Sequence, residues 1–218
     1  MITKDKPIKI DFFKEVVSIM AEKIKRNEDY LTKLDSDIGD GDHGVNMNIG
    51  FSSVSKNINQ TSKNSKDIGD FLKKVGFTLL DKIGGASGPL YGSLFMTMGS
   101  TVKGKNEIFF QDYIQMLERG LETLEKRGKA KVGDKTMIDV LGPYVKFLLK
   151  NRNKDGLGKI LDTGKKLSKE KVEDTKGLFP KKGRAARLGK KAVGFVDPGG
   201  ASINFLLDSF YDVFKKIE

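Results

Sequence analysis

The chain has 218 residues, enough for one well-cored domain, and we expect a single domain over residues 1–218. It contains no cysteine, which excludes disulfides and thiolate metal sites. No apolar run reaches the roughly 18 residues needed to cross a membrane, and the start lacks the apolar core of a signal peptide, so we expect a cytoplasmic protein without membrane attachment. The net charge of +11 suits a nucleic acid, a phosphorylated metabolite or an acidic protein, and does not choose among them.

Apolar residues recur at three- and four-residue spacing along most of the chain, and no stretch alternates with period two. Polar, glycine-containing junctions separate the periodic stretches. This pattern predicts an all-α fold of about seven or eight helices, an up-and-down bundle in which loops at one end of alternate helices share a rim. The expected helices cover residues 10–27, 45–58, 67–82, 90–98, 109–127, 138–148, about 165–176, and 198–214.

The first informative junction holds four carboxylates within eight residues, at Asp35, Asp37, Asp40 and Asp42, with the only histidine, His43, directly behind them. Crowded carboxylates repel unless a cation lies between them, and Mg²⁺ prefers such oxygen ligands. The interspersed glycines allow sharp turns, and a helix start behind the junction would favour an anion. An Asx-rich capping loop or a structural Ca²⁺ site is the alternative, although no EF-hand pattern is met.

Later junctions carry weaker signals. Gly84–Gly92 is rich in small residues before a buried helix, so its amides could face a phosphate, or it could be an ordinary turn without Walker A spacing. Asp134 or Thr136 is expected to cap the helix that follows. Arg184, among small residues, could reach a phosphate or stack on a base, and Pro198 opens the last helix.

Taken together, the junctions resemble one protein family. The segments Asp35-x4-Asp40-x-Asp42-His43-Gly44, Gly84–Pro89, Gly133–Met137, Gly183–Ala185 and Asp197–Gly199 occur in the order found in DhaL, the nucleotide-binding L subunit of dihydroxyacetone kinases. Fatty-acid kinase domains share the general plan but differ at the first junction. The resemblance implies an eight-helix antiparallel barrel with ADP or ATP and two Mg²⁺ ions at one end.

The resemblance also implies a role for individual residues. It places the metals on Asp35, Asp40 and Asp42, which with Arg184 are the expected catalytic residues. Residues His43, Gly44, Val45, Asn46, Ala86 and Ser87 are expected around the phosphates, with His43 as a hydrogen-bond donor or positioning group. Residues Gly128, Met137, Arg184, Asp197, Pro198 and Gly199 are expected to hold the nucleoside. The chain departs from the family pattern at Ala186-Arg187, where Ser-Tyr is more usual, and at Phe195-Val196, where His-Gln is common. These two departures concern the nucleoside pocket and the partner surface.

The function implied is phosphoryl transfer to dihydroxyacetone, which a separate K subunit holds. The nucleotide would be a retained coenzyme, rephosphorylated by a phosphohistidine M subunit of the sugar phosphotransferase system. Alternatives are an ATP-exchanging kinase for another short ketose such as erythrulose, or a non-catalytic paralogue that engages a transcriptional regulator. We expect a homodimer or a complex with the K subunit, and no nucleic-acid binding, because the aromatic residues fit a helical core.

Overall fold

Nine α-helices form most of the computed structural model, which describes residues 6–154 and 156–217. The prediction of an all-α fold is confirmed. The helices are α1 Ile10–Arg26, α2 Glu28–Ile38, α3 His43–Lys63, α4 Ile68–Lys82, α5 Ser87–Thr101, α6 Phe110–Gly128, α7 Ile138–Asn151, α8 Leu157–Asp174 and α9 Pro198–Ile217. Two short strands, β1 (Ile8–Lys9) and β2 (Glu107–Ile108), pair antiparallel.

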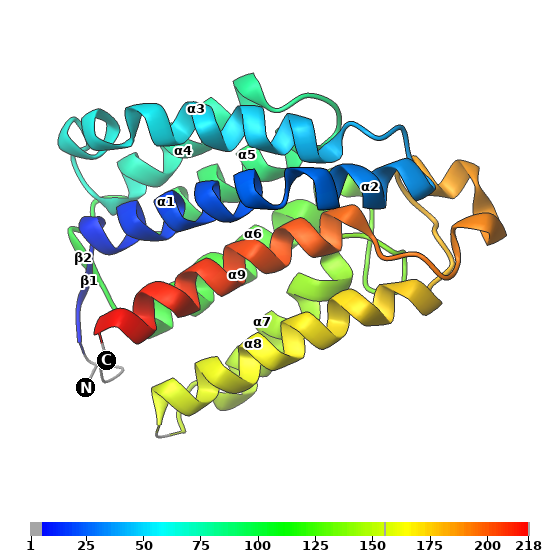
Figure 1. Ribbon diagram of the computed structural model, residues 1–218. Helices are drawn as coiled ribbons and strands as arrows, with labels where there is room; N and C mark the ends of the chain where they lie inside the picture. Colours follow the sequence, from blue (N-terminus) through cyan, green and yellow to red (C-terminus); the bar gives the residue numbers. More distant parts are fainter. Residues whose placement is uncertain (1–5, 155, 218) are drawn as a thin grey trace.

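The helices close into a ring, because each contacts the next along the chain and α9 returns to pack on α1 (Figure 1). Helices α1 and α2 lie end to end, and both pack against α3 and α9, so together they fill one place in a ring of eight. The break falls at Asn27, whose side-chain amide donates to the carbonyl of Lys23 at 2.8 Å. A helix end near Asn27 was predicted correctly, but α2 was not predicted.

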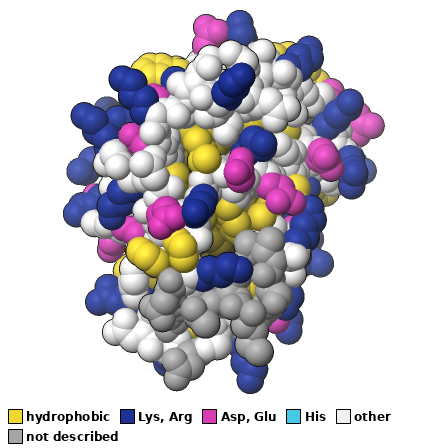
Figure 2. All heavy atoms as spheres, turned by 90° about the vertical axis from the view of Figure 1, so that its left-hand side faces the viewer, with side chains coloured by type: hydrophobic (Ala, Val, Ile, Leu, Met, Phe, Trp, Pro, Cys, Tyr) yellow, Lys and Arg dark blue, Asp and Glu magenta, His cyan; other side chains and the backbone are white. Residues whose placement is uncertain are grey.

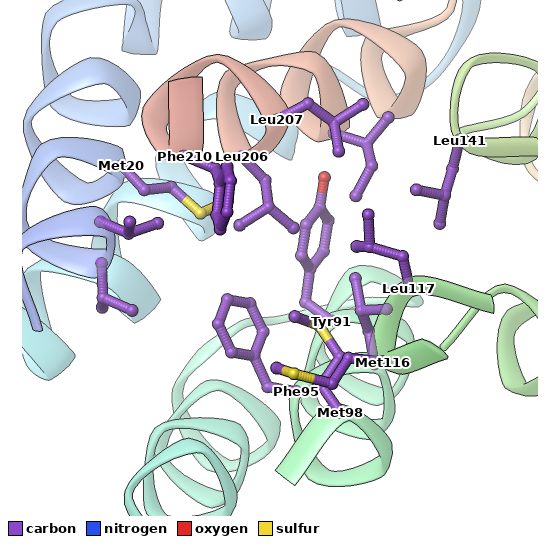
Figure 3. Close-up of a cluster of buried hydrophobic side chains, with 14 of the residues drawn as sticks. Met20, Tyr91, Phe95, Met98, Met116, Leu117, Leu141, Leu206, Leu207 and Phe210 are labelled. Carbon is purple, nitrogen blue, oxygen red and sulfur yellow. The ribbon is translucent and has the colours of Figure 1, made fainter. Parts of the chain in front are cut away.

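The inside of the ring is filled by the apolar faces that the three- and four-residue spacing predicted. Figure 3 shows side chains from α1, α5, α6, α7 and α9 meeting there. The rings of Tyr113 and Phe210 stack with centroids 3.7 Å apart, which joins α6 to α9. Each fully buried large side chain contributes about 1.5–3 kcal/mol to stability. The last helix is therefore fixed to the middle of the chain by apolar packing.

Glycines bring α4 and α5 unusually close. A Cβ atom at Gly76 would lie 2.7 Å from the carbonyl oxygen of Gly92, and one at Gly99 would lie 2.5 Å from that of Gly69. Carbon and oxygen atoms cannot approach so closely without a backbone shift. The spacing between these two helices thus depends on residues without side chains.

The two ends of the barrel differ. The connections 39–42, 83–86, 129–137 and 175–197 all lie at one end, as expected for an up-and-down barrel, and β1 and β2 lie at the other (Figure 1). Figure 2 faces the strand end and shows basic and acidic side chains interspersed around small apolar patches. No helix among the described residues is long and apolar enough to span a membrane.

Some sequence interpretations were wrong in detail. The apolar residues Phe77, Leu80 and Ile49 lie in the expected helices 67–82 and 45–58, but they are 60%, 38% and 48% exposed and do not belong to the core. Helix α3 starts at His43 and continues to Lys63, although the polar run after Asn57 was expected to be a connection. The sequence pattern is misleading about burial and about the end of α3 for two reasons. One helix face can be polar along its whole length, and a single apolar residue does not define a buried face.

Candidate functional site

The acidic cluster is assembled from a helix and a turn. Asp35 lies in the last turn of α2, whereas Asp40 and Asp42 lie in the turn that leads into α3. Each of the three carboxylates offers one oxygen, and these oxygens lie within 4.8 Å of one another. The fourth carboxylate, Asp37, is exposed on α2 and does not belong to the cluster. The three clustered carboxylates are the ones that the resemblance selected from the four, and Asp37 was not among them.

Asp35 is buried and connects α2 to the start of α3. Its Oδ2 accepts hydrogen bonds from the backbone N–H of Asp42 at 2.9 Å and of His43 at 3.1 Å. These are amides at a helix start, where a negative charge is stabilised. A Cβ atom at Gly39 would lie 2.0 Å from Asp35 Oδ1, and Gly41 has a φ of +74°, so both positions favour glycine. The local sequence therefore presents the carboxylates in a fixed arrangement.

A cavity of about 520 Å³ opens beside this cluster. Its wall includes residues from the first turns of α3, α5, α7 and α9, so four helix N-termini meet at one place. Each helix start carries a partial positive charge of roughly half a unit and N–H groups without a partner inside the helix, of which Asp35, Thr136 and Asp197 already accept some. The cavity thus offers carboxylates for a hard cation next to amides for an anion, the donor set that a metal–phosphate ligand requires.

Most of the predicted site residues line this cavity. They are Asp35, Asp40, Asp42, His43, Ala86, Ser87, Gly128, Met137, Arg184, Asp197, Pro198 and Gly199. Three others do not: Gly44 is buried against α2, Val45 is 42% exposed, and Asn46 lies against Gly84. The proposed ligand contacts of all these residues stay predictions, although the structure brings most of their side chains to one place.

Arg184 crosses from the α8–α9 connection to the acidic cluster. Its Nε lies 2.7 Å from Asp40 Oδ1, and both side chains are partly exposed. An exposed ion pair of this kind adds little to folding stability, about 0–1 kcal/mol. The ion pair instead positions the guanidinium of Arg184 where a metal–phosphate group would meet the acidic cluster.

His43 is hydrogen-bonded within the protein at both ring nitrogens. Its Nε2 lies 3.0 Å from Ser202 Oγ, which is also within hydrogen-bond distance of Tyr91 Oη at 2.7 Å and of the carbonyl of Gly199 at 3.1 Å. Burial lowers the pKa of His43 even though Asp35 and Asp42 oppose this effect, so the ring is neutral at pH 7.

The other ring nitrogen, Nδ1, lies 3.1 Å from Ser87 Oγ, so a neutral ring donates to one of the two serine hydroxyls and accepts from the other. The ring of His43 is committed to protein groups at both nitrogens. Of the two roles predicted for this side chain, the geometry favours a positioning group over a phosphate donor, and the group it positions is the Ser87 hydroxyl at the start of α5.

Asp197 is the most strongly perturbed carboxyl group in the cavity wall. Its Oδ2 accepts from the Gly200 N–H at 2.7 Å, which caps α9. Burial raises its pKa to about 7, and the hydrogen bond from Gly200 and the charge of Lys135 offset only part of this effect. The Asp197 carboxyl group in the cavity wall can therefore gain or lose a proton near neutral pH.

Sequence reasoning missed several residues of the cavity wall, including Tyr91, Arg127 and Lys135. Tyr91 was counted among apolar helix residues, and Arg127 marked only the end of a helix. Lys135 belongs to the segment Gly133–Met137, but the resemblance implied no role for this residue. Neither Asp134 nor Thr136 is the N-cap of α7, because Met137 holds that position without a side-chain cap. Thr136 Oγ1 accepts from Ile138 N at 3.2 Å, and the Asp134 carboxylate accepts from Lys131 N at 3.0 Å.

Fold and site together define a class of protein, the closed helical barrels that present an acidic cluster and several helix N-termini to one cavity. The model of the DAK2 domain matches residues 37–212, and the chain belongs to this family. Over 208 residues it is 44% identical to the "PEP-dependent dihydroxyacetone kinase 2, ADP-binding subunit DhaL" of Listeria innocua, and the match covers 94% of this chain and 95% of that protein. The resemblance to DhaL inferred from the motifs is confirmed.

Further relatives agree. The corresponding DhaL subunit of Escherichia coli is 38% identical over 82% of this chain and 85% of its own length. An L-erythrulose 1-kinase of Mycolicibacterium smegmatis is 29% identical, and the match covers 83% of this chain but 32% of that enzyme. These relatives are named as kinases or kinase subunits, which confirms the prediction of a phosphotransferase.

A solved structure shows the same fold. The dihydroxyacetone kinase of C. freundii, crystallised with AMP-PNP and Mg²⁺, superposes with a TM-score of 0.72 at 22% identity. The match covers 95% of this chain and 34% of that one. The fold of this chain therefore corresponds to about one third of that larger chain.

Proposed function

We propose that the chain is the nucleotide-binding subunit of a dihydroxyacetone kinase. It keeps one ADP or ATP bound and uses it to pass a phosphoryl group from a phosphohistidine M subunit to dihydroxyacetone held by a K subunit. The observation that carries the proposal is the meeting of three carboxylates and four helix N-termini in one cavity. The names of the relatives, which are ADP-binding subunits of PEP-dependent kinases, support the choice of nucleotide and donor.

Asp35, Asp40 and Asp42 are the residues that would hold the metal. Their oxygens lie close enough to share cations, and all three are the hard ligands that Mg²⁺ prefers. Bound there, Mg²⁺ would neutralise charge on the phosphates. Two ions would carry four positive charges against the three carboxylates and about three negative charges on ADP, a small negative excess. Arg184 and the helix starts can offset that excess.

The surroundings of the cavity suit an acidic partner. Between Lys176 and Gly194 the chain carries seven basic residues and no Asp or Glu. Such a surface speeds the approach of a negatively charged protein and affects the association rate more than the final affinity. This supports docking of a phosphoprotein donor at the cavity rim. A complex with the K subunit, or a homodimer, remains part of the proposal.

Nucleotide retention is the property to measure first. Protein purified and dialysed with Mg²⁺ is denatured, and the released ADP is quantified. Near-stoichiometric ADP is expected for a retained coenzyme. The variants Asp35→Ala, Asp40→Ala and Asp42→Ala should release it, whereas Asp37→Ala, a matched exposed carboxylate on α2, should keep it. Normal occupancy in all of the first three variants would refute the metal assignment.

One alternative has support from a relative. The similarity to an L-erythrulose 1-kinase favours an ATP-exchanging enzyme for another short ketose as the second candidate. In that case the dialysed protein would be empty but would readily take up ATP. A non-catalytic paralogue that engages a transcriptional regulator would retain nucleotide without supporting phosphoryl transfer in the presence of K and M subunits. A protein that binds neither ADP nor ATP would overturn the proposal.

A further inference from the structure

The connection that carries Arg184 leaves the barrel and returns to almost the same point. We call residues 176–194 the Arg184 loop; it contains the short 3₁₀ helices η2 (Ala185–Arg187) and η3 (Gly189–Ala192) and projects from the site end of the barrel (Figure 1). Its two ends are joined by a backbone hydrogen bond from Gly194 N to the carbonyl of Lys176 at 2.8 Å. The loop is therefore closed at its base.

Lys135 reaches this base from a different connection. Its side chain is almost completely buried, with 1% of the residue exposed. Its Nζ donates to the carbonyl oxygen of Thr175 at 2.5 Å and to that of Phe195 at 2.6 Å. Thr175 directly precedes the Arg184 loop and Phe195 directly follows it. One ammonium group thus holds both ends of the loop.

The backbone around Lys135 is shaped for this contact. Lys135 has a φ of +60°, in the left-handed region that residues with a side chain seldom adopt. The Asp139 carboxylate holds the turn by accepting from Gly133 N at 2.5 Å and from Thr136 N at 2.7 Å. An unfavourable backbone conformation maintained by its neighbours indicates that the direction of this side chain matters.

Away from its base, the Arg184 loop contacts the barrel through the partly exposed side chain of Lys181, whose Nζ donates to the carbonyl of Gly133 at 3.0 Å and lies 3.3 Å from Asp134 Oδ1. The apolar contact of the loop is a small cluster of Ile38, Ala185 and Ala192, separate from the main core. Arg184 itself is held at Asp40 by one exposed ion pair. Such contacts stabilise a segment only weakly, so the contacts at its base determine how far the loop can move.

Lys135 also adjoins the nucleoside side of the cavity. Its neighbours Thr136 and Met137 line the cavity wall, and Lys181 of the loop donates from its backbone N–H to the carbonyl of Asp134 at 3.0 Å. The turn that faces the nucleoside and the loop that carries Arg184 are therefore one connected structure, with the Lys135 ammonium at its centre.

We propose that Lys135 is a positioning residue that fixes the base of the Arg184 loop, so that Arg184 stays at Asp40 and the bound nucleotide dissociates slowly. Both partners of Nζ are carbonyl oxygens, which only accept, so the contact requires a donor at this position. Arginine can supply two donors, whereas methionine fills the space and leaves two buried carbonyls without a partner. The part that concerns nucleotide rests on the proposed function.

The first test needs no nucleotide. Amide hydrogen exchange is compared in nucleotide-free wild-type protein, Lys135→Met, Lys135→Arg and the control Lys190→Met, an exposed lysine of the same loop. We expect residues 176–194 to exchange about tenfold faster in Lys135→Met alone, with α4 unchanged. Equal exchange of the loop in all four proteins would overturn the proposal. If α4 also loses protection, Lys135→Gln, which keeps one donor group, is examined in place of Lys135→Met under the same criterion.

The second test asks whether Lys135 acts through Arg184. The dissociation rate of a fluorescent ADP analogue with Mg²⁺ should rise about tenfold in Lys135→Met and in Arg184→Ala, remain near wild type in Lys135→Arg, and rise no further in the double variant. Multiplying effects in the double variant would overturn the positioning role, because a general loss of structure would add to the loss of Arg184. A wild-type protein that binds no nucleotide would refute the proposed function, and the exchange experiment would still decide the role of Lys135.

Discussion

Asparagine at position 35 separates the structural role of the acidic cluster from its metal-binding role. Asp35 accepts two hydrogen bonds from the start of α3, so its charge stabilises the protein even without a cation. The Asp42 carboxylate accepts no hydrogen bond from the described part of the chain, although its oxygen lies in the same cluster. Asp35→Asn and Asp42→Asn should therefore both weaken Mg²⁺ binding, but they should differ in folding stability.

The size of the difference follows from the two hydrogen bonds. A hydrogen bond to a charged group contributes about 1.5–3 kcal/mol, against about 0.5–1.5 kcal/mol for a neutral pair. Both bonds end on Asp35 Oδ2, so the amide oxygen of an asparagine can accept both in neutral form, and Asp35→Asn should cost about 1–3 kcal/mol relative to Asp42→Asn. Both changes relieve the same repulsion between carboxylates, so this term largely cancels in the comparison.

Urea or thermal unfolding of both variants in EDTA measures the difference. For a chain of this length, we expect the melting temperature of Asp35→Asn to lie about 3–8 °C below that of Asp42→Asn. An Asp35→Asn protein that is as stable as Asp42→Asn without metal would refute the reasoning, because the two amide contacts would then contribute nothing. Unchanged Mg²⁺ affinity in either variant would refute the metal assignment separately.

Three further outcomes are expected. Gly44→Ala would place a Cβ atom 2.1 Å from a backbone carbonyl oxygen of α2 and should cost about 1–3 kcal/mol in urea unfolding, while Gly177→Ala, in open space, should cost little. Tyr91→Phe removes the buried hydrogen bond between Tyr91 Oη and Ser202 Oγ and should lower the free energy of unfolding by about 1–2 kcal/mol; unchanged stability would contradict a contribution of this bond. Because the pKa of Asp197 is raised from 3.8 to about 7, its native form holds a proton longer than the unfolded form, so stability should fall as pH rises from about 4 to 7. Asp197→Asn should lose up to about 4 kcal/mol of this pH dependence in nucleotide-free protein, and parallel pH curves would show that the carboxyl group titrates normally.

The fold class and the position of the site could be predicted because they depend on local patterns. Apolar spacing defined most helices, and polar junctions marked the end of the barrel where the site lies. Helix α2 was missed because only Leu31, Asp35 and Ile38 of its eleven residues are buried, and one of these is a carboxylate. A short helix stabilised by its neighbours and not by its own apolar face leaves little trace in sequence.

The role of Lys135 could not be predicted for a different reason. Its partners are backbone carbonyls of Thr175 and Phe195, which lie 40 and 60 residues away and whose side chains carry no signal of the contact. The exposure of Phe77 was equally hidden, since an apolar residue at helical spacing reads the same on either face. Contacts between a side chain and a distant part of the backbone can be identified only from the three-dimensional structure.

The closure of the ring between α9 and α1 has a consequence during synthesis. The cavity takes three carboxylates from residues 35–42 and another part of its wall from Asp197 and Pro198, which leave the ribosome about 155 residues later. A nascent chain that has not yet released α9 has neither a closed barrel nor a complete cavity. Ligand capture is then possible only after the whole barrel has formed, and a ligand that binds only the folded state adds its binding energy to the stability of the folded barrel alone.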